Sequence, residues 1–456
     1  MSTTEGKVAT NATAPATPLR QVGYWAAVLA WFICAMLYFY QYAVRSAPGV
    51  MRGVMSATWG NDPVAMMNAY YYMVYAFSAL IAGALLDRYG ARKTLPIAAA
   101  SVGAFSLLLA SGNEHLAVAG FTLQAIGAVF GFVGSVYVAA KLLPPRSLPT
   151  FVGLAQMLGM AGAAVGSKPV AEAIGKNPGL GWPWQSIWVV FAVSGVILAI
   201  ALWRILPARP TSPAPFSFKG LIRPYEVVFE NPQSYLCGLI GGLLFAPTTI
   251  GVMVWATSFL HQGEHVTISD AASLVSTVPI GWIIGCPLMG FISDRIGRRK
   301  PVLITGAVAM GFLTVFAIYV QPPMAVRYAV ALGLGIASGA AMIPFSMIKE
   351  ANPPEVKGSA AGAMNFLCFG VTGVLSPFIA KLLDAGPGGT ETLPGFQHGL
   401  ATLAFGVAVA LILTFFLRET GQAGARQQKH DQVLPGGPGM SPIYPGALQP
   451  AALQGD

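Results

Sequence analysis

The chain has 456 residues, of which 55% are hydrophobic and only 9% are charged. A soluble domain carries about 25% charged residues, so this composition excludes a protein whose whole surface faces water. Lys and Arg number 26 against 17 Asp and Glu, and in a membrane protein this excess is typical of cytoplasmic loops rather than of nucleic-acid binding.

Apolar stretches follow one another along most of the chain. A helix that spans a bilayer needs about 20 apolar residues. About twelve stretches approach this length: roughly 21–44, 63–85, 95–111, 115–140, 149–174, 185–206, 233–260, 270–292, 302–320, 324–348, 358–383 and 397–417. The longest internal break is the polar, proline-containing stretch 207–232, which divides them six and six.

This order predicts an all-α membrane protein with twelve transmembrane helices in two pseudo-symmetric six-helix bundles. The expected parts are a cytoplasmic tail at 1–20, an N-terminal bundle at 21–206, a cytoplasmic linker at 207–232, a C-terminal bundle at 233–417 and a second cytoplasmic tail at 418–456. The first tail lacks an apolar core and the second is rich in Gly, Pro and Gln, so we expect both to be disordered.

Lys and Arg lie mainly in alternate loops. With the N-terminus inside, the loops on that side contain Arg88, Arg92, Lys93, Lys141, Arg146, Arg204, Arg209, Lys219, Arg223, Arg295, Arg298, Arg299, Lys300, Lys349 and Lys357. In the opposite loops Arg52, Lys176 and Arg327 stand out. Because Lys and Arg are enriched on the cytoplasmic side, we expect both termini in the cytoplasm of a multi-pass protein of a bacterial inner membrane.

One polar segment occurs twice between apolar stretches. Its copies are GALLDRYGARK at 83–93 and GFISDRIGRRK at 290–300, and Gly, Asp, Arg, Gly, Arg and Lys recur in the same order. The halves also echo each other where Lys141 and Lys349 each precede a pair of prolines. This duplication predicts two related halves about a pseudo-two-fold axis along the membrane normal, with a central cavity between them.

The repeated segment resembles the signature loop of the major facilitator superfamily of secondary transporters, and with the apolar stretches the resemblance covers about 21–417. The first copy departs at Ala91, where the family often has a basic residue. The resemblance implies alternating access, with the segment acting as a latch on the cytoplasmic side. The residues implied for this gate are Gly83, Asp87, Arg88, Gly90, Arg92, Gly290, Asp294, Arg295, Gly297 and Arg299.

The chemistry of the repeated segment suits a gate. Gly83 and Gly290 would let two helices approach closely. Asp87 and Asp294 would accept charge-assisted hydrogen bonds from Arg and from an opposing helix N-terminus. The alternative is a set of basic anchors that only fix topology, and it stays open above all for the last basic residues of each copy.

The first apolar stretch contains an arginine. Arg45 follows the aromatic run 38–42, and an intramembrane arginine is costly unless it faces protein, water or a ligand. Its planar fork suits a carboxylate or a phosphate. The stretch is similar to the first helix of organic-anion and organophosphate members of the superfamily, which implies that Arg45 contacts an anionic substrate. The alternative is an interfacial arginine at the outer end of the helix, close to Arg52.

A second arginine expected for a phosphate substrate is missing. The organophosphate members place it in their seventh helix, whereas 233–260 contains no charged residue. Since one arginine neutralises a phosphate dianion poorly, the sequence favours a carboxylate-like monoanion or a substrate with a second polar end.

Other polar residues of the apolar stretches are candidates for substrate binding or ion coupling. The expected substrate-binding set is Arg45, Tyr42, Tyr38, Tyr71, Tyr75, Gln124 and Asn365. Possible coupling residues are Glu172, Lys168 and Lys381, the last because the oxalate/formate-exchanger branch, which the chain also resembles, uses a lysine in its eleventh helix. The alternatives are that Glu172 only pairs with Lys168 one turn away, and that Lys381 extends to the membrane surface.

The sequence therefore predicts a secondary active transporter of a small organic anion, by symport or exchange, and not an enzyme. A neutral or zwitterionic solute, such as a sugar, a peptide or a drug, is the alternative, and a transporter-like solute receptor is a further one. The 5 His and 4 Cys residues form no zinc or nucleophile constellation, so we expect no metal, cofactor or nucleic acid. The expected partners are the solute, the lipid bilayer and either H⁺ or a counter-anion, and one chain suffices for a monomeric transporter.

Overall fold

The structure is a computed structural model that describes residues 23–144, 148–175, 179–207, 218–389 and 392–421. Within these ranges every regular element is a helix. The expected tail at 1–20 lies outside the described residues, as does most of the tail at 418–456.

The N-terminal half contains the first six spans. Its helices are α1 (Tyr24–Trp59), α2 (Val64–Tyr89), α3 (Ala91–Ala110), α4 (Glu114–Ala128), α5 (Phe130–Leu142), α6 (Leu148–Ile174) and α7 (Trp184–Ile205). The helices α4 and α5 together form one span. A short helix, α8 (Phe218–Glu230), lies in the expected linker.

The C-terminal half contains the other six. Its seventh span runs through α9 (Pro232–Ala246), the π-helix η2 (Pro247–Trp255), α10 (Ala256–Ser258) and the π-helix η3 (Phe259–Gly263). Four of the remaining spans are single helices: α11 (Ile268–Ile296), α12 (Lys300–Tyr319), α15 (Lys357–Ala385) and α16 (Leu393–Phe416). The tenth span is made of α13 (Met324–Ser338), η4 (Gly339–Met342) and α14 (Ile343–Glu350). A short helix, η5 (Pro354–Val356), precedes α15.

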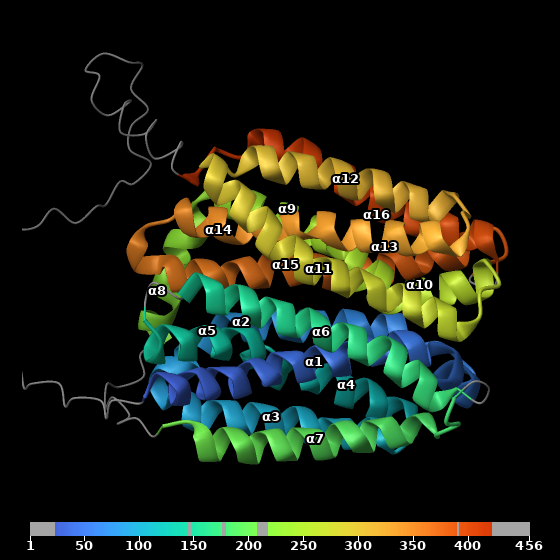
Figure 1. The fold of residues 1–456 in the computed structure, drawn as a ribbon, viewed down its shortest axis with the longest axis horizontal. Coiled ribbons are helices and arrows are strands. Elements are labelled where there is room, and N and C mark those ends of the chain that lie inside the picture. Colours follow the sequence, from blue (N-terminus) through green and yellow to red (C-terminus); the bar gives the residue numbers. More distant parts are fainter. Residues whose placement is uncertain (1–22, 145–147, 176–178, 208–217, 390–391, 422–456) are drawn as a thin grey trace, which may run out of the picture.

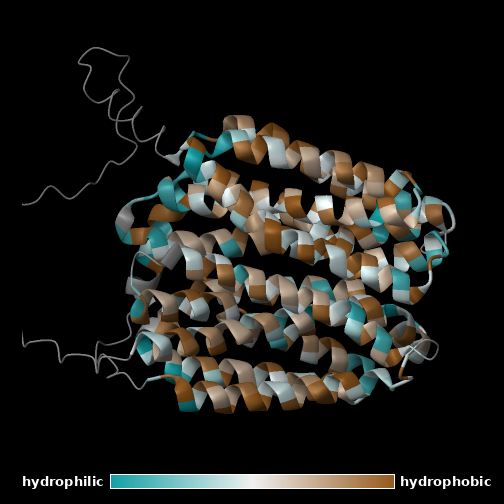
Figure 2. Cartoon of the chain, in the orientation of Figure 1, coloured by the Kyte–Doolittle hydropathy of each residue, from teal (hydrophilic) through white to brown (hydrophobic). Residues whose placement is uncertain are grey.

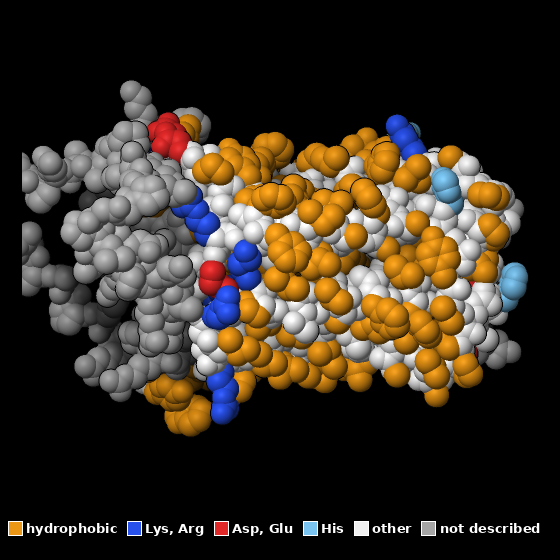
Figure 3. Space-filling view, turned by 90° about the horizontal axis from the view of Figure 1, so that it is seen from above, with side chains coloured by type: hydrophobic (Ala, Val, Ile, Leu, Met, Phe, Trp, Pro, Cys, Tyr) orange, Lys and Arg blue, Asp and Glu red, His pale blue; other side chains and the backbone are white. Residues whose placement is uncertain are grey.

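Twelve helical stretches of the described residues are long and apolar enough to cross a membrane, which confirms the predicted fold class. Figure 1 shows the helices side by side, with α1 to α7 in the lower part of the view and α9 to α16 in the upper part. In Figure 2 hydrophobic residues run along the helices and hydrophilic residues gather at the two ends. The space-filling view in Figure 3 shows the same broad hydrophobic band, with Lys and Arg at its edge.

The first helix is longer than the sequence predicted. We expected it to end near residue 44, whereas α1 continues to Trp59 with Pro48 inside it. Apolar residues resume after the proline, and the helix stops only at Gly60, whose φ of 75° suits glycine. Arg45 therefore lies in the middle of a helix and not at its outer end.

The two halves pack together at the end away from the repeated segment. There α2 runs along α15, where Ser376 Oγ donates to the Ala65 carbonyl oxygen at 3.2 Å. Likewise α6 runs along α11, where Ser276 Oγ donates to the Ala164 carbonyl oxygen at 3.1 Å. Between α1 and η2 the backbones meet, because a Cβ added at Gly49 would overlap the Met253 carbonyl group.

The other end carries both copies of the repeated segment, and we name it the motif end. Here the glycines of the same four interface helices are open. A Cβ added at Gly83, Gly153, Gly290 or Gly358 would meet no atom of the described residues within 4 Å. The prediction that Gly83 and Gly290 permit close helix packing is therefore wrong for this conformation, since no neighbouring helix reaches them.

Helix α8 joins the two halves at the motif end. The Tyr225 hydroxyl donates to the Leu80 carbonyl oxygen of α2 at 2.7 Å. It also lies against Gly362 of α15, where a Cβ would clash with it. Burial raises the pKa of Tyr225 to about 12, so this hydroxyl stays a donor across the physiological range. The expected linker thus contains a helix that contacts both halves.

Candidate functional site

The centre of the molecule holds a buried arginine without a counter-charge. Arg45 is 1% exposed, and its Nε, Nη1 and Nη2 atoms have no hydrogen-bond partner among the described residues. Its guanidinium carbon lies 3.8 Å from the centre of the Tyr42 ring, one helical turn earlier on α1. It lies 5.4 Å from the Tyr72 ring and 5.9 Å from the Phe369 ring. Aromatic faces stabilise the cation but accept none of its hydrogen bonds.

Two further groups near this cation are unpaired. The Tyr71 hydroxyl donates to Gln41 Oε1 at 3.2 Å, which leaves Gln41 Nε2 without a partner. The hydroxyl of Tyr72, which lies near Thr249, likewise forms no hydrogen bond of normal geometry with any described residue. Both Gln41 and Tyr72 are buried, so the site offers hydrogen-bond donors to an acceptor that the protein does not supply.

The C-terminal half covers the same cation with an aromatic ring. Phe369 of α15 stacks on Tyr72 with ring centres 5.5 Å apart and an interplanar angle of 12°. It also meets Tyr75 edge-on, with centres 4.9 Å apart. We name Tyr42, Tyr71, Tyr72, Tyr75 and Phe369 the aromatic cluster. Because its members come from both halves, the cluster lies where a central binding site is expected.

The sequence analysis missed the contributions of the C-terminal half. Phe369 lies one turn from Asn365 on α15, and that spacing was a signal that could have found it. Thr249 and Thr372, whose hydroxyl oxygens lie 3.1 Å apart, are both buried and carried no signal in the sequence. Tyr72 was likewise absent from the expected substrate-binding set.

The other expected substrate-binding residues are spread around the cluster. The Tyr38 hydroxyl lies 3.0 Å from Gln156 Oε1 on α6 and 3.3 Å from the Tyr42 hydroxyl. Gln124 Nε2 donates to Ser106 Oγ at 2.9 Å, so it ties α4 to α3 inside the N-terminal half. Asn365 Nδ2 donates to the Ala361 carbonyl oxygen of its own helix at 2.9 Å.

A second buried arginine lies on the same helix, and it is paired. Arg52 is 6% exposed, and its Nε and Nη2 atoms both contact the Asp62 carboxylate. Its guanidinium carbon lies 3.2 Å from the centre of the Trp255 ring, which belongs to η2 in the other half. Arg52 thus joins the halves at the end away from the repeated segment.

The candidate coupling residues lie toward that same end. Lys168 Nζ and Glu172 Oε1 are 3.8 Å apart, and both side chains are about half exposed. Lys381 is exposed. Within the described ranges no group of three or more His, Cys, Asp or Glu residues could hold a metal ion.

The second copy of the repeated segment forms a network inside the C-terminal half. Arg299 Nη1 lies 2.5 Å from Asp294 Oδ1, and Arg299 Nη2 lies 2.7 Å from Glu350 Oε1 on α14. The hydrogen bonds to Glu350, and then those to Asp294, raise the pKa of Arg299 above its usual range. Arg298 Nε lies 3.6 Å from Glu419 Oε2. None of these pairs reaches the N-terminal half.

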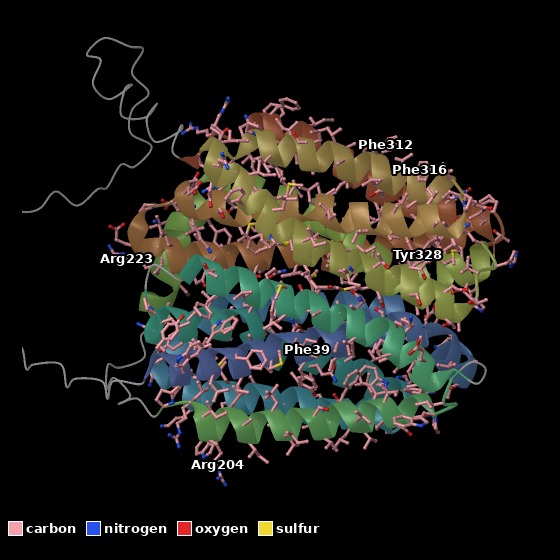
Figure 4. The ribbon with its side chains drawn as sticks, in the orientation of Figure 1. Phe39, Arg204, Arg223, Phe312, Phe316 and Tyr328 are labelled. Atoms are coloured by element: carbon pink, nitrogen blue, oxygen red, sulfur yellow. The ribbon has the colours of Figure 1, made fainter. Side chains whose placement is uncertain are left out.

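The first copy of the repeated segment is arranged differently. Gly90, with a φ of 74°, turns the chain from α2 into α3, as Gly297, with a φ of 68°, does between α11 and α12. The guanidinium of Arg92 lies 5.6 Å from the Trp203 ring of α7. The side chain of Asp87 lies outside the part of the chain that the structure describes. The motif end also carries Arg204 and Arg223 (Figure 4).

Known protein families and structures resemble this chain in sequence and in architecture. A family model described as Major Facilitator Superfamily matches residues 23–377. The chain belongs to the Major Facilitator Superfamily. The superfamily resemblance, the transport function and the absence of an enzymatic role predicted from the sequence are thereby confirmed.

Its relatives among characterised and uncharacterised proteins are distant. The "Uncharacterized MFS-type transporter YceJ" of Bacillus subtilis is 23% identical over 79% of this chain and 88% of its own length. The "Probable metabolite transport protein CsbC" of Bacillus subtilis is 34% identical, but the match spans only 33% of this chain and 32% of that protein. The "Arabinose-proton symporter" of Bacillus subtilis is 29% identical over 39% of this chain and 37% of its own length.

Solved structures share the fold. A D-xylose-proton symporter superposes with a TM-score of 0.66 and 17% identity over 86% of this chain and 97% of its own. A bacterial homologue of the human lysosomal transporter Spinster, in an inward-facing and unoccupied conformation, gives a TM-score of 0.66 and 14% identity over 86% of this chain and 97% of its own. The relatives whose printed names give a solute or a solute class are metabolite and sugar transporters, so they do not support the organic-anion or oxalate/formate branch that the sequence resemblance implied.

Proposed function

We propose that this member of the superfamily is a secondary active transporter of a small organic monoanion whose carboxylate binds Arg45. The observation that carries the proposal is the buried guanidinium, whose three nitrogen atoms have no hydrogen-bond partner in the described part of the chain. A buried charge without a partner is strongly unfavourable. A bound carboxylate would supply charge-assisted hydrogen bonds, each contributing about 1.5–3 kcal/mol.

The charge balance of the site favours a single negative charge on the solute. Arg45 contacts aromatic rings from both halves. The seventh span, from Pro232 to Gly263, contains no Asp, Glu, Lys or Arg. One cation therefore faces one anion, and a dianion would keep an uncompensated charge away from water.

The packing of the halves supports alternating access to this site. They contact each other at the Arg52 end, whereas the interface glycines are open at the motif end. We propose that the repeated segment closes the motif end in the opposite conformation, and that this end is cytoplasmic in a bacterial inner membrane. The coupling partner, H⁺ or a counter-anion, and the participation of Lys168, Glu172 and Lys381 are part of the same proposal, as is a monomeric state.

Counterflow in proteoliposomes tests the anion proposal. Vesicles that contain the purified protein are loaded with an unlabelled monocarboxylate and diluted into the labelled compound. We expect accumulation by the wild type and by the control Arg204→Lys, which changes an exposed arginine at the end of α7. Arg45→Lys keeps the charge but loses the planar fork, and we expect it to slow accumulation about 10-fold or more. Full activity of Arg45→Lys would contradict the proposal.

A neutral sugar is the second candidate solute. It is favoured by the printed names of the relatives, among them the arabinose-proton symporter and the "D-xylose transporter" of Levilactobacillus brevis, which is 28% identical over 44% of each chain. Labelled xylose and arabinose are therefore included in the same counterflow assay. Accumulation of either pentose that persists in Arg45→Lys would favour the sugar and reject the monoanion.

A further inference from the structure

We infer that the solute is an aromatic monocarboxylate, that is, a flat ring that bears one carboxylate. The inference rests on the proposed function and names the chemistry of the part of the solute that Arg45 does not bind. Two observations support it: aromatic rings surround the guanidinium of Arg45, and the unpaired polar atoms beside that guanidinium are few.

The guanidinium is surrounded by ring faces from both halves. Tyr42 on α1, Tyr72 on α2 and Phe369 on α15 all lie within 5.9 Å of its central carbon. Phe369 is held in turn by Phe245 of α9, with ring centres 5.8 Å apart. A carboxylate that reaches Arg45 therefore brings the rest of its molecule among aromatic rings, where offset-stacked and edge-on contacts favour another ring.

The unpaired donors match one carboxylate. Arg45 offers three nitrogen atoms, Gln41 offers Nε2 and Tyr72 offers its hydroxyl. A carboxylate has two oxygen atoms with about four acceptor positions. These donors are more than enough to satisfy it, and the donor hydrogens that remain can serve a further acceptor on the solute.

Four buried polar side chains of the C-terminal half that lie near Phe245 and Phe369 are already paired with each other or with the backbone. Thr249 Oγ1 donates to the Phe245 carbonyl oxygen at 3.1 Å and lies 3.1 Å from Thr372 Oγ1. Trp282 Nε1 donates to Thr248 Oγ1 at 3.0 Å. A solute with several hydroxyl groups would lose its hydration there and find few partners. Each buried hydroxyl without a partner weakens binding about 10-fold, which disfavours a sugar acid.

Two nearby side-chain amides do not provide enough further partners for a solute with several hydroxyl groups. Gln156 Nε2 and Asn68 Oδ1 are also buried and unpaired. Gln156 lies beside Tyr38, whose hydroxyl is 3.0 Å from Gln156 Oε1. Asn68 lies one turn from Tyr72 on α2. They offer one donor and one acceptor, which would suit a single ring substituent and not a polyhydroxylated chain.

A ring in this place would also connect the two halves. The Tyr72–Phe369 stack joins α2 to α15 across the interface. A solute ring inserted between the two would replace this direct contact by two contacts with itself. Phe369 is therefore a specificity-determining residue, because its ring would meet the ring of the solute while Arg45 binds the carboxylate.

A thermal-shift titration of the purified protein in detergent tests the inference. The probes are benzoate, cyclohexanecarboxylate, gluconate and xylose, which separate ring planarity, apolar size, hydroxylation and charge. We expect benzoate to stabilise the protein at a concentration about 10-fold lower than gluconate and several-fold lower than cyclohexanecarboxylate. Xylose is expected to give no shift.

Variants at position 369 identify the ring contact. Phe369→Leu should raise the apparent Kd for benzoate about 2-fold to 10-fold, the value of one aromatic pair, and Phe369→Tyr should keep it. The matched control is Phe312→Leu, which changes a lipid-facing phenylalanine of α12 that is 68% exposed (Figure 4). The melting temperatures without ligand show whether each variant folds.

The outcomes distinguish the inference from the proposed function. If gluconate binds more tightly than benzoate and both need Arg45, the aromatic solute is wrong and the monoanion stands. Equal affinities for benzoate and cyclohexanecarboxylate, no shift with benzoate, or an unchanged Kd in Phe369→Leu would also overturn the aromatic solute. If xylose stabilises the protein and Arg45→Lys does not alter that shift, the proposed function itself fails.

Discussion

Two arginines of α1 occupy similar surroundings and differ in one respect. Arg45 and Arg52 are seven residues apart, which places them on the same face of the helix about 10 Å from each other. Both are buried, and both lie over an aromatic ring. Arg52 has a carboxylate partner in Asp62, whereas no described residue pairs with Arg45.

This difference separates a structural cation from a ligand-binding one. A buried cation whose carboxylate is part of the chain is satisfied in every conformation in which the two stay together. A buried cation without a partner is satisfied only when something else arrives. Arg52 can therefore hold the two halves together through Trp255, and Arg45 can respond to a solute.

Giving Arg45 a partner of its own should have the largest effect. In Tyr72→Glu a carboxylate is placed beside the guanidinium, which makes Arg45 resemble Arg52. We expect this resident carboxylate to compete with the solute and to reduce monocarboxylate accumulation at least about 100-fold, the equivalent of a charge-assisted bond of about 3 kcal/mol. The measurement is counterflow in proteoliposomes.

The control for that substitution is Tyr72→Phe, which keeps the ring and removes only the hydroxyl. It should lower the affinity about 5-fold to 10-fold through the loss of one hydrogen bond. If Tyr72→Glu transported as well as Tyr72→Phe, a free guanidinium would not be what the solute needs.

Removing the partner of Arg52 should have a smaller effect, and on stability rather than on solute recognition. Asp62→Asn leaves a buried guanidinium without its counter-charge. Breaking a fully buried pair costs about 3–5 kcal/mol, but the Asp62 side chain is 31% exposed, so we expect a loss of about 1–2 kcal/mol. Denaturation in detergent, followed by tryptophan fluorescence, measures it.

The same experiment has an internal check. Asp62→Asn combined with Arg52→Gln removes the unpaired charge, so the double variant should be more stable than Asp62→Asn alone. A double variant that is less stable than the single one would mean that Arg52 contributes mainly through its packing on Trp255.

A third arginine also has a carboxylate partner, and the change at that carboxylate should have the smallest effect on stability. Arg327 pairs with Glu264 beyond the end of the seventh span. Burial raises the pKa of Glu264 above its usual 4.5, and Arg327 opposes this only in part. The folded protein therefore keeps a proton that the unfolded chain has lost, and stability should fall as pH rises from about 4.5 through the raised pKa.

Glu264→Gln should remove this slope, whereas Glu226→Gln, at an exposed position of α8, should leave it unchanged. Melting temperatures of the three proteins across that pH window provide the measurement. A slope of the opposite sign in the wild type would show that Arg327 outweighs burial and holds Glu264 ionised.

The fold could be predicted from the sequence because its signals are regular. The twelve apolar stretches and the repeated segment determine the number of spans and the two halves. The extent of α1 could not be predicted, because Pro48 suggests an end that the apolar residues after it override. As a result the sequence left Arg45 either within the first helix or at its outer end, and only the structure shows that it is buried inside α1.

The site could be predicted only where a residue is chemically unusual. An arginine among tyrosines in a membrane span is unusual, so Arg45, Tyr42, Tyr71 and Tyr75 were identified as candidates. Phe369 is an ordinary apolar residue of an apolar helix, and only the contact between α2 and α15 brings it to Tyr72. Gln124 is polar but pairs with Ser106, and a partner 18 residues away cannot be read from the chain alone.

The central claim is that Arg45 is satisfied by the carboxylate of the solute. Isothermal titration of the detergent-solubilised protein with benzoate tests it most directly, with wild type and Arg45→Gln compared under the same conditions. We expect a Kd for the wild type that rises about 10-fold to 100-fold in Arg45→Gln, the loss of one charge-assisted contact, while Arg204→Gln binds as the wild type does. Binding of benzoate with the same Kd by Arg45→Gln, in a protein that melts like the wild type, would contradict the account.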